Sequence, residues 1–372
     1  MLIANNRDSE VVNRDIAIIG GGSAGITFAS QLKQHSAVVI EPKTPAERDA
    51  CWALWATNQQ QDNLQSAIKG RWNQWRLVDN EREVIHHSGQ YDYICLSSAD
   101  YLTHCEASLS ENVELVRATA EDITTSGQGG TFSALGKNYQ AKYIYDSRPP
   151  VAAKAGLKQH FLGIEIRTKN PLKNPNIATL MDFRVDQSRG LHFIYALPYS
   201  DHEILVESTI ISKTLEPEDW YRQAIDQWLE NQGIEVENII RQESGVIAMH
   251  HSIPEDPSMA RIGAASGAVR QSSGYAFTNI QSQISQLVCG IEKGKFEVPK
   301  PISKQLNYLD KIFNGVLLAE PQLAVNLMMQ TAGSLSPEGF ARFMLGKATF
   351  SDWIRVILAM PKRPFIKQVF MQ

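Results

Sequence analysis

The chain opens with short apolar runs on either side of a glycine-rich turn. Residues 15–19 form an apolar run that predicts a β-strand, and residues 26–34 have the periodicity of a helix. The run at residues 36–41 predicts a second strand. A strand, a helix and another strand in this order are typical of a βαβ unit, so the chain should begin with a parallel sheet.

Elements of the same kind continue beyond this unit. Residues 92–95 predict a strand, residues 97–109 a helix and residues 113–119 a further strand. Residues 124–137 are rich in Gly, Ser and Thr and indicate a hairpin turn. Residues 143–146 then predict a fourth strand of the first sheet.

The middle of the chain has a different pattern. Short runs rich in Ile, Val, Phe, Tyr and Thr are separated by Pro, Asn, Gly and Asp, which predicts a mixed or antiparallel sheet. The four runs are residues 161–168, 178–185, 191–197 and 203–211. An amphipathic helix is expected at residues 217–231, a Gly/Ala/Ser-rich turn at 261–274 and a helix at 275–293. From residue 302 onward the pattern is helical.

These patterns predict an α/β protein with a discontinuous first domain. We expect a Rossmann-type domain from residues 1–150 and 255–300, an inserted mixed or antiparallel sheet for the substrate at 151–254, and a helical C-terminal region at 301–372. The length of 372 residues suits about two domains.

Composition narrows the class of protein. A hydrophobic content of 43% with 20% charged residues is typical of a globular protein, and a net charge of −4 argues against nucleic acid as a partner. The four cysteines are widely spaced and predict no metal site and no disulfide framework. The N-terminal residues lack the layout of a signal peptide, and no apolar stretch reaches 18 residues. We therefore predict a cytoplasmic protein.

The first glycine-rich turn has the pattern of a dinucleotide site. In Gly20-x-Gly22-x-x-Gly25, the first glycine allows a tight turn, the second allows close approach of a pyrophosphate and the third allows close helix packing. Ser23 and Ala24 would offer backbone N–H groups at the helix N-terminus. Glu41, 21 positions after Gly20, would accept a hydrogen bond from a ribose hydroxyl. The alternative is a glycine-rich turn without a ligand.

A second glycine-rich turn bears on the choice of cofactor. Gly263 begins this turn, and Gly274 and Tyr275 end it immediately before the predicted late helix. A second helix N-terminus suits the ribityl and isoalloxazine end of a flavin, so the sequence favours FAD over NAD. The first domain would then be FAD-binding and Rossmann-type (GR2-like). The alternative is an ordinary connection between a strand and a helix.

Six segments, in order, resemble the lycopene cyclase family of FAD flavoproteins. They span about residues 15 to 280 and are Gly20 to Gly25, the Cys-Trp-Ala-Leu-Trp run at 51–55, Ile-Tyr-Asp-Ser-Arg at 144–148, Leu-Met-Asp-Phe at 180–183, Leu-Val-Glu-Ser-Thr at 205–209 and the late turn at 263–275. Two positions differ from the family pattern, where contact with substrate or flavin is expected. The family has two adjacent acids where this chain has Glu207 and Ser208, and His-Pro where it has Arg270 and Gln271.

The resemblance implies closure of ionone rings at the ψ-ends of lycopene, without net redox change. An acid protonates a terminal alkene, a neighbouring double bond attacks the tertiary carbocation, and a proton is then lost. Because an alkene is a very weak base, the acid needs a dry site in which burial keeps its proton on. The resemblance also implies that FAD is used in its reduced form, with NAD(P)H as a reductant.

Two carboxyls are candidates for the catalytic acid. Strand alternation places Glu207 on one face with Leu205 and Thr209, and it is the first candidate for acid or cation stabiliser. Asp182 is the second. The alternatives are a structural hydrogen-bond acceptor or a solvated side chain for Glu207, and a turn or strand-end cap for Asp182.

Further residues are candidates for binding. Arg148 would position the flavin or its phosphates, or else form a structural ion pair. Trp52 and Trp55 would line a tunnel for a polyene or carotenoid substrate, or else belong to the core. The segment 340–370 mixes Trp, Phe, Leu and Ile with Lys and Arg, which suits either peripheral association with a membrane or a packed lid.

Two other functions remain open from the sequence. One is a flavin-dependent monooxygenase or halogenase of the same fold that acts on another apolar substrate. The other is a carotenoid or flavin binder without catalysis.

Overall fold

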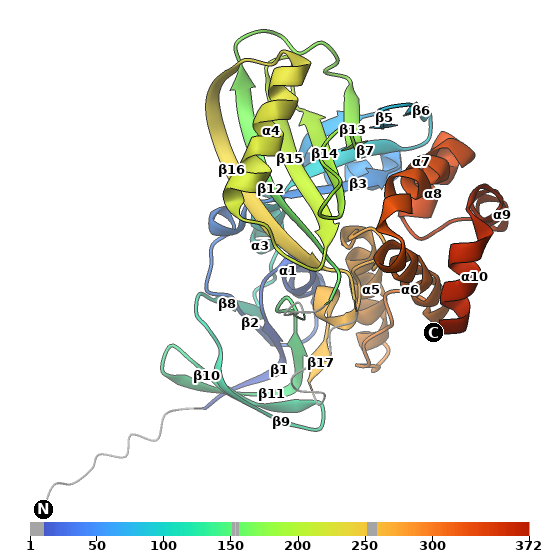
Figure 1. Ribbon diagram of the computed structural model, residues 1–372. Helices are drawn as coiled ribbons and strands as arrows, with labels where there is room; N and C mark the ends of the chain where they lie inside the picture. Colours follow the sequence, from blue (N-terminus) through green and yellow to red (C-terminus); the bar gives the residue numbers. More distant parts are fainter. Residues whose placement is uncertain (1–10, 151–152, 154–155, 251–258, 372) are drawn as a thin grey trace, which may run out of the picture.

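The computed structural model describes residues 11–150, 153, 156–250 and 259–371, and Figure 1 shows its arrangement. A seven-stranded sheet near the N-terminus has the order β8-β2-β1-β11-β10-β9, and β17 pairs with β11. Its strands are β1 (Val11–Ile19), β2 (Ala37–Ile40), β8 (Val113–Val116), β9 (Glu121–Ser126), β10 (Gly129–Ala134), β11 (Lys137–Asp146) and β17 (Ala260–Arg261). The predicted opening βαβ unit is confirmed.

The centre of this sheet is parallel and buried on both faces. Alternate residues of β1 face opposite sides, which is why its C-terminal half is an unbroken apolar run. Ile16 and Ile18 pack under α1 (Ser23–Gln31) and α5 (Phe277–Ile291), whereas Ala17 and Ile19 pack under the β9–β10–β11 meander. The strands β1, β11 and β17 end side by side, because Ile19 pairs with Asp146 and Asp146 with Arg261.

A second seven-stranded sheet, in the order β16-β12-β15-β14-β13-β5-β6, forms the upper part of Figure 1. Its strands are β5 (Gln74–Val78), β6 (Glu83–His87), β12 (Lys158–Thr168), β13 (Ile177–Asp182), β14 (Leu191–Pro198), β15 (Glu203–Ser212) and β16 (Val236–Ala248). The four strands predicted in the middle of the chain are confirmed. The sequence did not predict β5, β6 and β16, and the first two come from outside the segment 151–254.

One face of the second sheet is covered by a helix and the other faces the middle of the molecule. The helix α4 (Glu218–Gln232) packs Tyr221, Ile225, Trp228 and Leu229 against the even-numbered side chains of β12 and β15. The opposite face carries the odd-numbered side chains, among them Leu205 and Glu207 of β15. This alternation decides which side chains of the second sheet point toward the middle of the molecule.

A small sheet and the C-terminal helices complete the fold. The three-stranded sheet β3-β7-β4 is built from β3 (Cys51–Ala56), β4 (Ile68–Trp72) and β7 (Asp92–Ser97), and α3 (Ser98–Ala107) follows it. The C-terminal helices are α6 (Lys304–Ala319), α7 (Ala324–Ser334), α8 (Pro337–Met344), α9 (Phe350–Ala359) and α10 (Lys362–Met371). They stack at one side of the second sheet (Figure 1).

Within the part of the chain that the structure describes, no single helix has both the length and the apolar composition to cross a membrane. Residues Lys304–Ala319 and Pro321–Ser334 satisfy both criteria only as a pair, with a bend of 108° between them.

Candidate functional site

The glycine turn after β1 is shaped by close contacts of its backbone. Gly20 has a φ of +95°, which disfavours any residue with a side chain. A Cβ at Gly25 would lie 2.0 Å from the carbonyl oxygen of Gly20, so only glycine lets α1 start this close to the turn. A Cβ at Gly22 would meet no atom within 4 Å, and open space therefore lies in front of the first turn of α1.

The N-terminus of α1 faces this open space. Gly22 is the N-cap residue, and Ser23 lines the adjoining cavity. The Gly25 N–H donates to Ser147 Oγ at 3.0 Å, which ties the helix to the end of β11. Backbone N–H groups at a helix start, next to open space, suit a pyrophosphate. The predicted positions Gly22, Ser23 and Ala24 are all part of this helix start.

Glu41 lies at the end of β2, beside the same turn. Its carboxylate is buried and accepts the Gly21 N–H at 2.8 Å and the Lys43 N–H at 2.9 Å. Arg48 donates to the Gly21 carbonyl at 2.7 Å and lies 3.4 Å from the same carboxylate. These contacts hold the Glu41 carboxylate at the place where the sequence predicted an acceptor for a ribose hydroxyl.

The late glycine turn lies against the first one. Because β17 pairs with β11, Gly263 reaches α1, and a Cβ at Gly263 would lie 2.6 Å from the Cβ of Ala24. Gly274 has a φ of +74° and precedes Tyr275, which lines the cavity. The structure thus brings together two turns that are distant in the sequence.

Arg148 is next to the first turn but has an anionic partner in the protein. Its guanidinium forms a bidentate ion pair with the Asp146 carboxylate, with both N–O distances at 2.9 Å. A Cβ at Gly20 would lie 3.1 Å from the Arg148 backbone nitrogen, so the arginine adjoins the turn. The ion pair is the structural alternative considered for this residue.

A cavity of about 310 Å³ extends from α1 to the second sheet. Aromatic and aliphatic side chains from the small sheet, the second sheet, the late turn and the C-terminal helices line it, among them Trp52, Tyr93, Phe161, Leu180, Met181, Phe193, Tyr195, Tyr275, Phe277 and Phe340. Glu207 is the acid among its lining residues. Such a mainly apolar chamber suits an extended hydrocarbon substrate.

Three tyrosine hydroxyls meet at the wall of this cavity. Tyr93 Oη lies 2.8 Å from Tyr195 Oη and 3.0 Å from Tyr275 Oη. Burial raises the pKa of each of these tyrosines, so all three stay neutral near neutral pH. Of the three, only Tyr275 was predicted from the sequence, although the alternation of β14 places Tyr195 on the same face as Phe193.

Glu207 faces the cavity from the centre of β15. The side chain is 8% exposed, and burial, followed by the nearby Glu243, raises its pKa well above the ordinary range. The following residue, Ser208, points to the opposite face and contacts His192 Nε2 at 2.9 Å. A second acid at position 208 would therefore point away from Glu207.

Asp182 lies outside the cavity. It is fully buried on the α4 side, where Arg184 donates three hydrogen bonds to it, one from its backbone N–H and two from its guanidinium. Trp228 Nε1 donates a further one at 2.9 Å. Although burial opposes the change, the hydrogen bonds from Arg184 and Trp228 lower the pKa of Asp182. A β-bulge between Thr179 and Asp182 interrupts the alternation of β13 and turns this carboxylate away from the site. We propose no catalytic role for Asp182.

The contacts of Asp182 predict a structural effect on mutation. Asp182→Asn should lower the free energy of unfolding by about 1–3 kcal/mol, because the buried acceptor of Arg184 loses its charge. Urea unfolding of the purified protein measures this effect. Asp226→Asn, an exposed position on α4, is the control and should stay within about 0.5 kcal/mol. Unchanged stability together with lost turnover would return Asp182 to the list of catalytic candidates.

The two predicted tryptophans lie in different surroundings. Trp52 lines the cavity and packs against Phe277, with ring centroids 5.7 Å apart. Trp55 is fully buried behind the lining, with its ring centroid 4.7 Å from Tyr93 and 5.3 Å from Tyr275. Trp52 can therefore contact a ligand in the cavity, whereas Trp55 packs behind Tyr93 and Tyr275, which line it.

Arg270, where contact with flavin or substrate was expected, points away from the cavity. Its guanidinium is buried and forms an ion pair with Asp310 of α6 at 2.7 Å. It also donates to the Phe343 and Met344 carbonyls at the end of α8. The residue therefore joins the late turn to the C-terminal helices.

The fold resembles those of solved flavoproteins. The chain aligns with a geranylgeranyl bacteriochlorophyll reductase-like protein from Thermoplasma acidophilum with a TM-score of 0.63 and 12% identity, covering 97% of this chain and 99% of that one. It also aligns with a point mutant of the halogenase PltM in complex with FAD, with a TM-score of 0.57 and 10% identity, covering 93% of this chain and 82% of that one. The predicted fold class is confirmed.

The sequence identifies the family within this class. The chain belongs to the lycopene cyclase family, because the family model "Lycopene cyclase protein" matches residues 15–369. It is 25% identical to a lycopene beta-cyclase of Pantoea ananas over 378 aligned positions, covering 95% of this chain and 96% of that protein.

Proposed function

We propose that this protein is an FAD-dependent carotenoid cyclase that forms ionone rings at the ψ-ends of lycopene or a close relative, without net redox change. One observation carries the proposal: Glu207, a buried carboxyl with a raised pKa, faces an apolar cavity beside the two glycine turns. Membership of the lycopene cyclase family supports the proposed reaction.

The surroundings of Glu207 suit an acid that protonates an alkene. A carboxyl with an ordinary pKa is ionised at neutral pH and has no proton to give. Burial favours the neutral form of Glu207, so the proton is present when the substrate arrives. The mainly apolar lining of the cavity would also disfavour water that competes for that proton or for the carbocation.

The aromatic lining would stabilise the positive charge that follows. Trp52, Phe161 and Phe193 present rings to the cavity, and the faces of such rings attract cations. After proton transfer, the carboxylate of Glu207 adds a negative charge next to the cation. The hydroxyls of Tyr93, Tyr195 and Tyr275 are polar groups that stay uncharged.

FAD fits the residues of the first domain. Gly22, Ser23 and Ala24 would hold the pyrophosphate, Glu41 the ribose, and Gly263 and Gly274 the flavin end, because the open space before α1 joins the cavity at Ser23. When bound and reduced, with NAD(P)H as its reductant, FAD would supply negative charge near the cation.

The function is tested by expressing the chain in a bacterial host that accumulates lycopene and resolving the pigments by chromatography. Ring-containing carotenes support the proposal and give the ring type and the number of cyclised ends. Repeating the assay without oxygen, with a chemical reductant, separates this reaction from that of a monooxygenase or halogenase, which would stop. Unchanged lycopene in cells that contain FAD-loaded protein contradicts the proposal.

We further propose that the α9–α10 face docks on a membrane surface. Several large apolar side chains on these helices are exposed, and they include Phe350 at 81%, Leu358 at 71% and Phe370 at 86%. The exposed cations Arg355, Lys362, Arg363 and Lys367 lie on the same two helices. Apolar side chains flanked by cations are typical of interfacial helices, and a carotene substrate dissolves in the bilayer.

The docking proposal predicts a loss of vesicle binding. The double variant Leu358→Glu with Phe370→Glu should bind at least about 10-fold more weakly to vesicles with anionic lipids, because each side chain loses about 1.5–3 kcal/mol of apolar transfer. Vesicle flotation measures binding. Leu215→Glu, an exposed leucine elsewhere on the surface, is the matched control. Equal vesicle binding by the double variant and the wild type would show that the α9–α10 face is not the docking surface.

A further inference from the structure

A row of four residues crosses the second sheet next to the cavity. Tyr195 of β14 pairs with Glu207 of β15, Glu207 pairs with Gly163 of β12, and Gly163 pairs with Glu243 of β16. Residues in register point to the same face of a sheet. Glu207 and Glu243 therefore stand on one face, with a residue that has no side chain between them.

The glycine between the two acids lets their carboxyls meet. A Cβ at Gly163 would lie 2.6 Å from Cγ of Glu207 and 3.2 Å from its Oε1. With glycine at this position, the side chain of Glu207 lies over the neighbouring strand and comes within hydrogen-bond contact of Glu243. Two carboxyls in such contact share one proton, because both cannot carry a negative charge at low cost.

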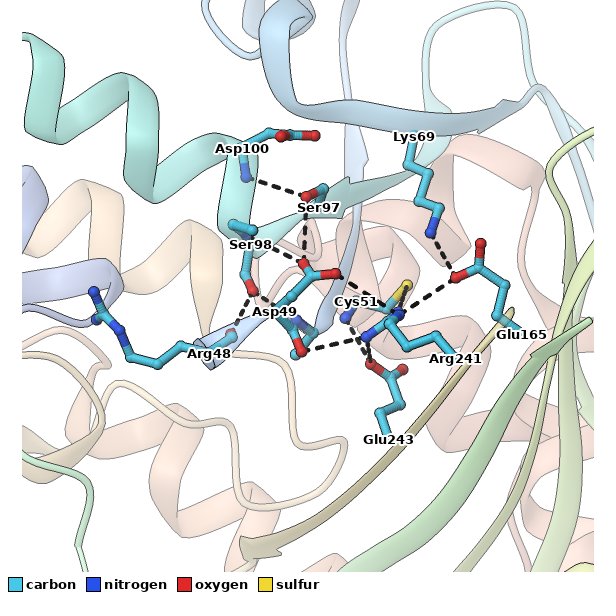
Figure 2. Close-up of polar contacts among 12 residues, drawn as sticks. Arg48, Asp49, Cys51, Lys69, Ser97, Ser98, Asp100, Glu165, Arg241 and Glu243 are labelled. Atoms are coloured by element: carbon cyan, nitrogen blue, oxygen red, sulfur yellow. Dashed lines mark hydrogen bonds and ion pairs between the residues drawn. The ribbon is translucent and has the colours of Figure 1, made fainter. Parts of the chain in front are cut away.

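The two carboxyls have different surroundings. Glu207 lines the cavity. Glu243 Oε2 accepts a hydrogen bond from Arg241 Nη1 at 2.8 Å and another from the Cys51 N–H at 3.1 Å, and Figure 2 shows both contacts. The ion pair and the backbone hydrogen bond favour the negative charge on Glu243. The shared proton therefore resides on the carboxyl of Glu207.

Arg241 is itself held in place by other acids. Its Nε lies 3.4 Å from Glu165 and 3.7 Å from Asp49, and Lys69 forms an ion pair with Glu165 at 2.6 Å. Figure 2 shows Arg241 at the centre of this network. Because these contacts hold the Arg241 guanidinium in one position, its ion pair with Glu243 has a fixed geometry.

We propose that Glu243 is a positioning residue for Glu207: the two carboxyls form a pair that shares one proton, and the Arg241 ion pair keeps this proton on the carboxyl that faces the cavity. The proposal rests on the proposed function, which it deepens. It also assigns the second acid to β16 rather than to the position after Glu207.

The proton balance closes over one cycle. The O–H bond of Glu207 breaks as a C–H bond forms at the terminal alkene, and the electron pair stays on the carboxylate. After ring closure, a C–H bond next to the cation breaks and an O–H bond forms again on the pair. No electron is gained or lost. Between these steps the pair carries two negative charges, which favour the return of the proton.

The pair predicts the pH dependence of turnover. The other charged or titratable groups that face Glu207 are Arg241, Cys51, Tyr195 and Tyr275. Burial raises the pKa of both tyrosines, and a hydrogen bond to a second cysteine together with burial raises the pKa of Cys51, so these groups stay neutral near neutral pH. Glu207 donates only when protonated, and activity is therefore lost as the pH rises through its pKa.

The test is the pH–rate profile of Glu243→Gln in the FAD-loaded full-length protein. Without the neighbouring negative charge, the alkaline limb should move to lower pH by about 1–3 units. At a fixed pH above the pKa of Glu207 in both proteins, each unit by which this pKa falls lowers the rate of the variant about 10-fold. The variant regains activity as the pH is lowered. Gly163→Ala keeps both acids but separates them and should shift the limb in the same direction. Glu203→Gln, a partly exposed position on β15, should leave the profile unchanged.

A second measurement does not depend on turnover. In infrared difference spectra against Glu207→Gln, the wild type should show a protonated carboxyl band at neutral pH that titrates at lower pH in Glu243→Gln. A band that titrates identically in both proteins, or a loss of activity that is equal at all pH values, overturns the proposal. If the band shifts as expected but lycopene is not cyclised, the carboxyl pair stands and the proposed function fails.

Discussion

Glu207→Gln should lower the rate of lycopene cyclisation by about 10²–10⁴-fold, the range typical of removing a general acid. The amide has nearly the same shape as the carboxyl but no proton acidic enough for an alkene. Because glutamine keeps the shape of the side chain and Glu207 is not among the residues proposed to hold FAD, FAD content should not change. The assay combines the flavin absorbance of purified protein with chromatography of the carotenes that it forms.

Glu203→Gln provides the matched control for this substitution. It makes the same chemical change four residues earlier on the same strand, at a side chain that is 31% exposed and paired with Arg167. Turnover should stay close to the wild-type value. If Glu207→Gln retains full activity with normal FAD content, another group protonates the substrate and the proposed mechanism is wrong.

Gly22→Ala should weaken FAD binding by about 10–100-fold without destabilising the apoprotein. A Cβ at this position meets no protein atom within 4 Å, so the folded chain tolerates it. The methyl group instead enters the space proposed for the pyrophosphate, where overpacking costs about 1–3 kcal/mol. Fluorescence titration of the apoprotein with FAD measures the affinity, and thermal unfolding without FAD measures the stability.

Gly89→Ala is the control for this second substitution. Gly89 is exposed, and a Cβ there also meets no atom within 4 Å, but the residue lies between β6 and β7, away from the turn. FAD affinity should not change. Unaltered affinity of Gly22→Ala would place the pyrophosphate elsewhere and would contradict the proposed cofactor site.

The local features of the site were predictable because each follows from neighbouring residues. Three glycines between an apolar strand and a helix have one compact geometry, and the acid at the end of the next strand falls beside it. The face of Glu207 followed from alternation within β15 alone. Each of these features depends on residues within one βαβ unit or one strand.

The rest of the site depends on contacts that alternation within one strand does not reveal. Glu243 stands on β16, whose first eight residues, Val-Glu-Asn-Ile-Ile-Arg-Gln-Glu, do not alternate between apolar and polar side chains, so the sequence contains no signal for a strand there. Tyr93 reaches Tyr195 only because the small sheet packs on the second one. Asp182 has a family-like sequence context, but a bulge in β13 turns it to the wrong face.

The two-residue strand β17 has a consequence for the order in which the protein assembles. It returns the chain to β11 after the whole second sheet, and it carries Gly263 to the side of α1. A flavin that touches both turns would bridge segments that are far apart in the sequence and meet only after β17 and α5 have reached the first sheet. Such long-range closure is slow, and a ligand that binds only the closed form pulls folding toward completion. Cofactor supply during synthesis should therefore govern the yield of native protein.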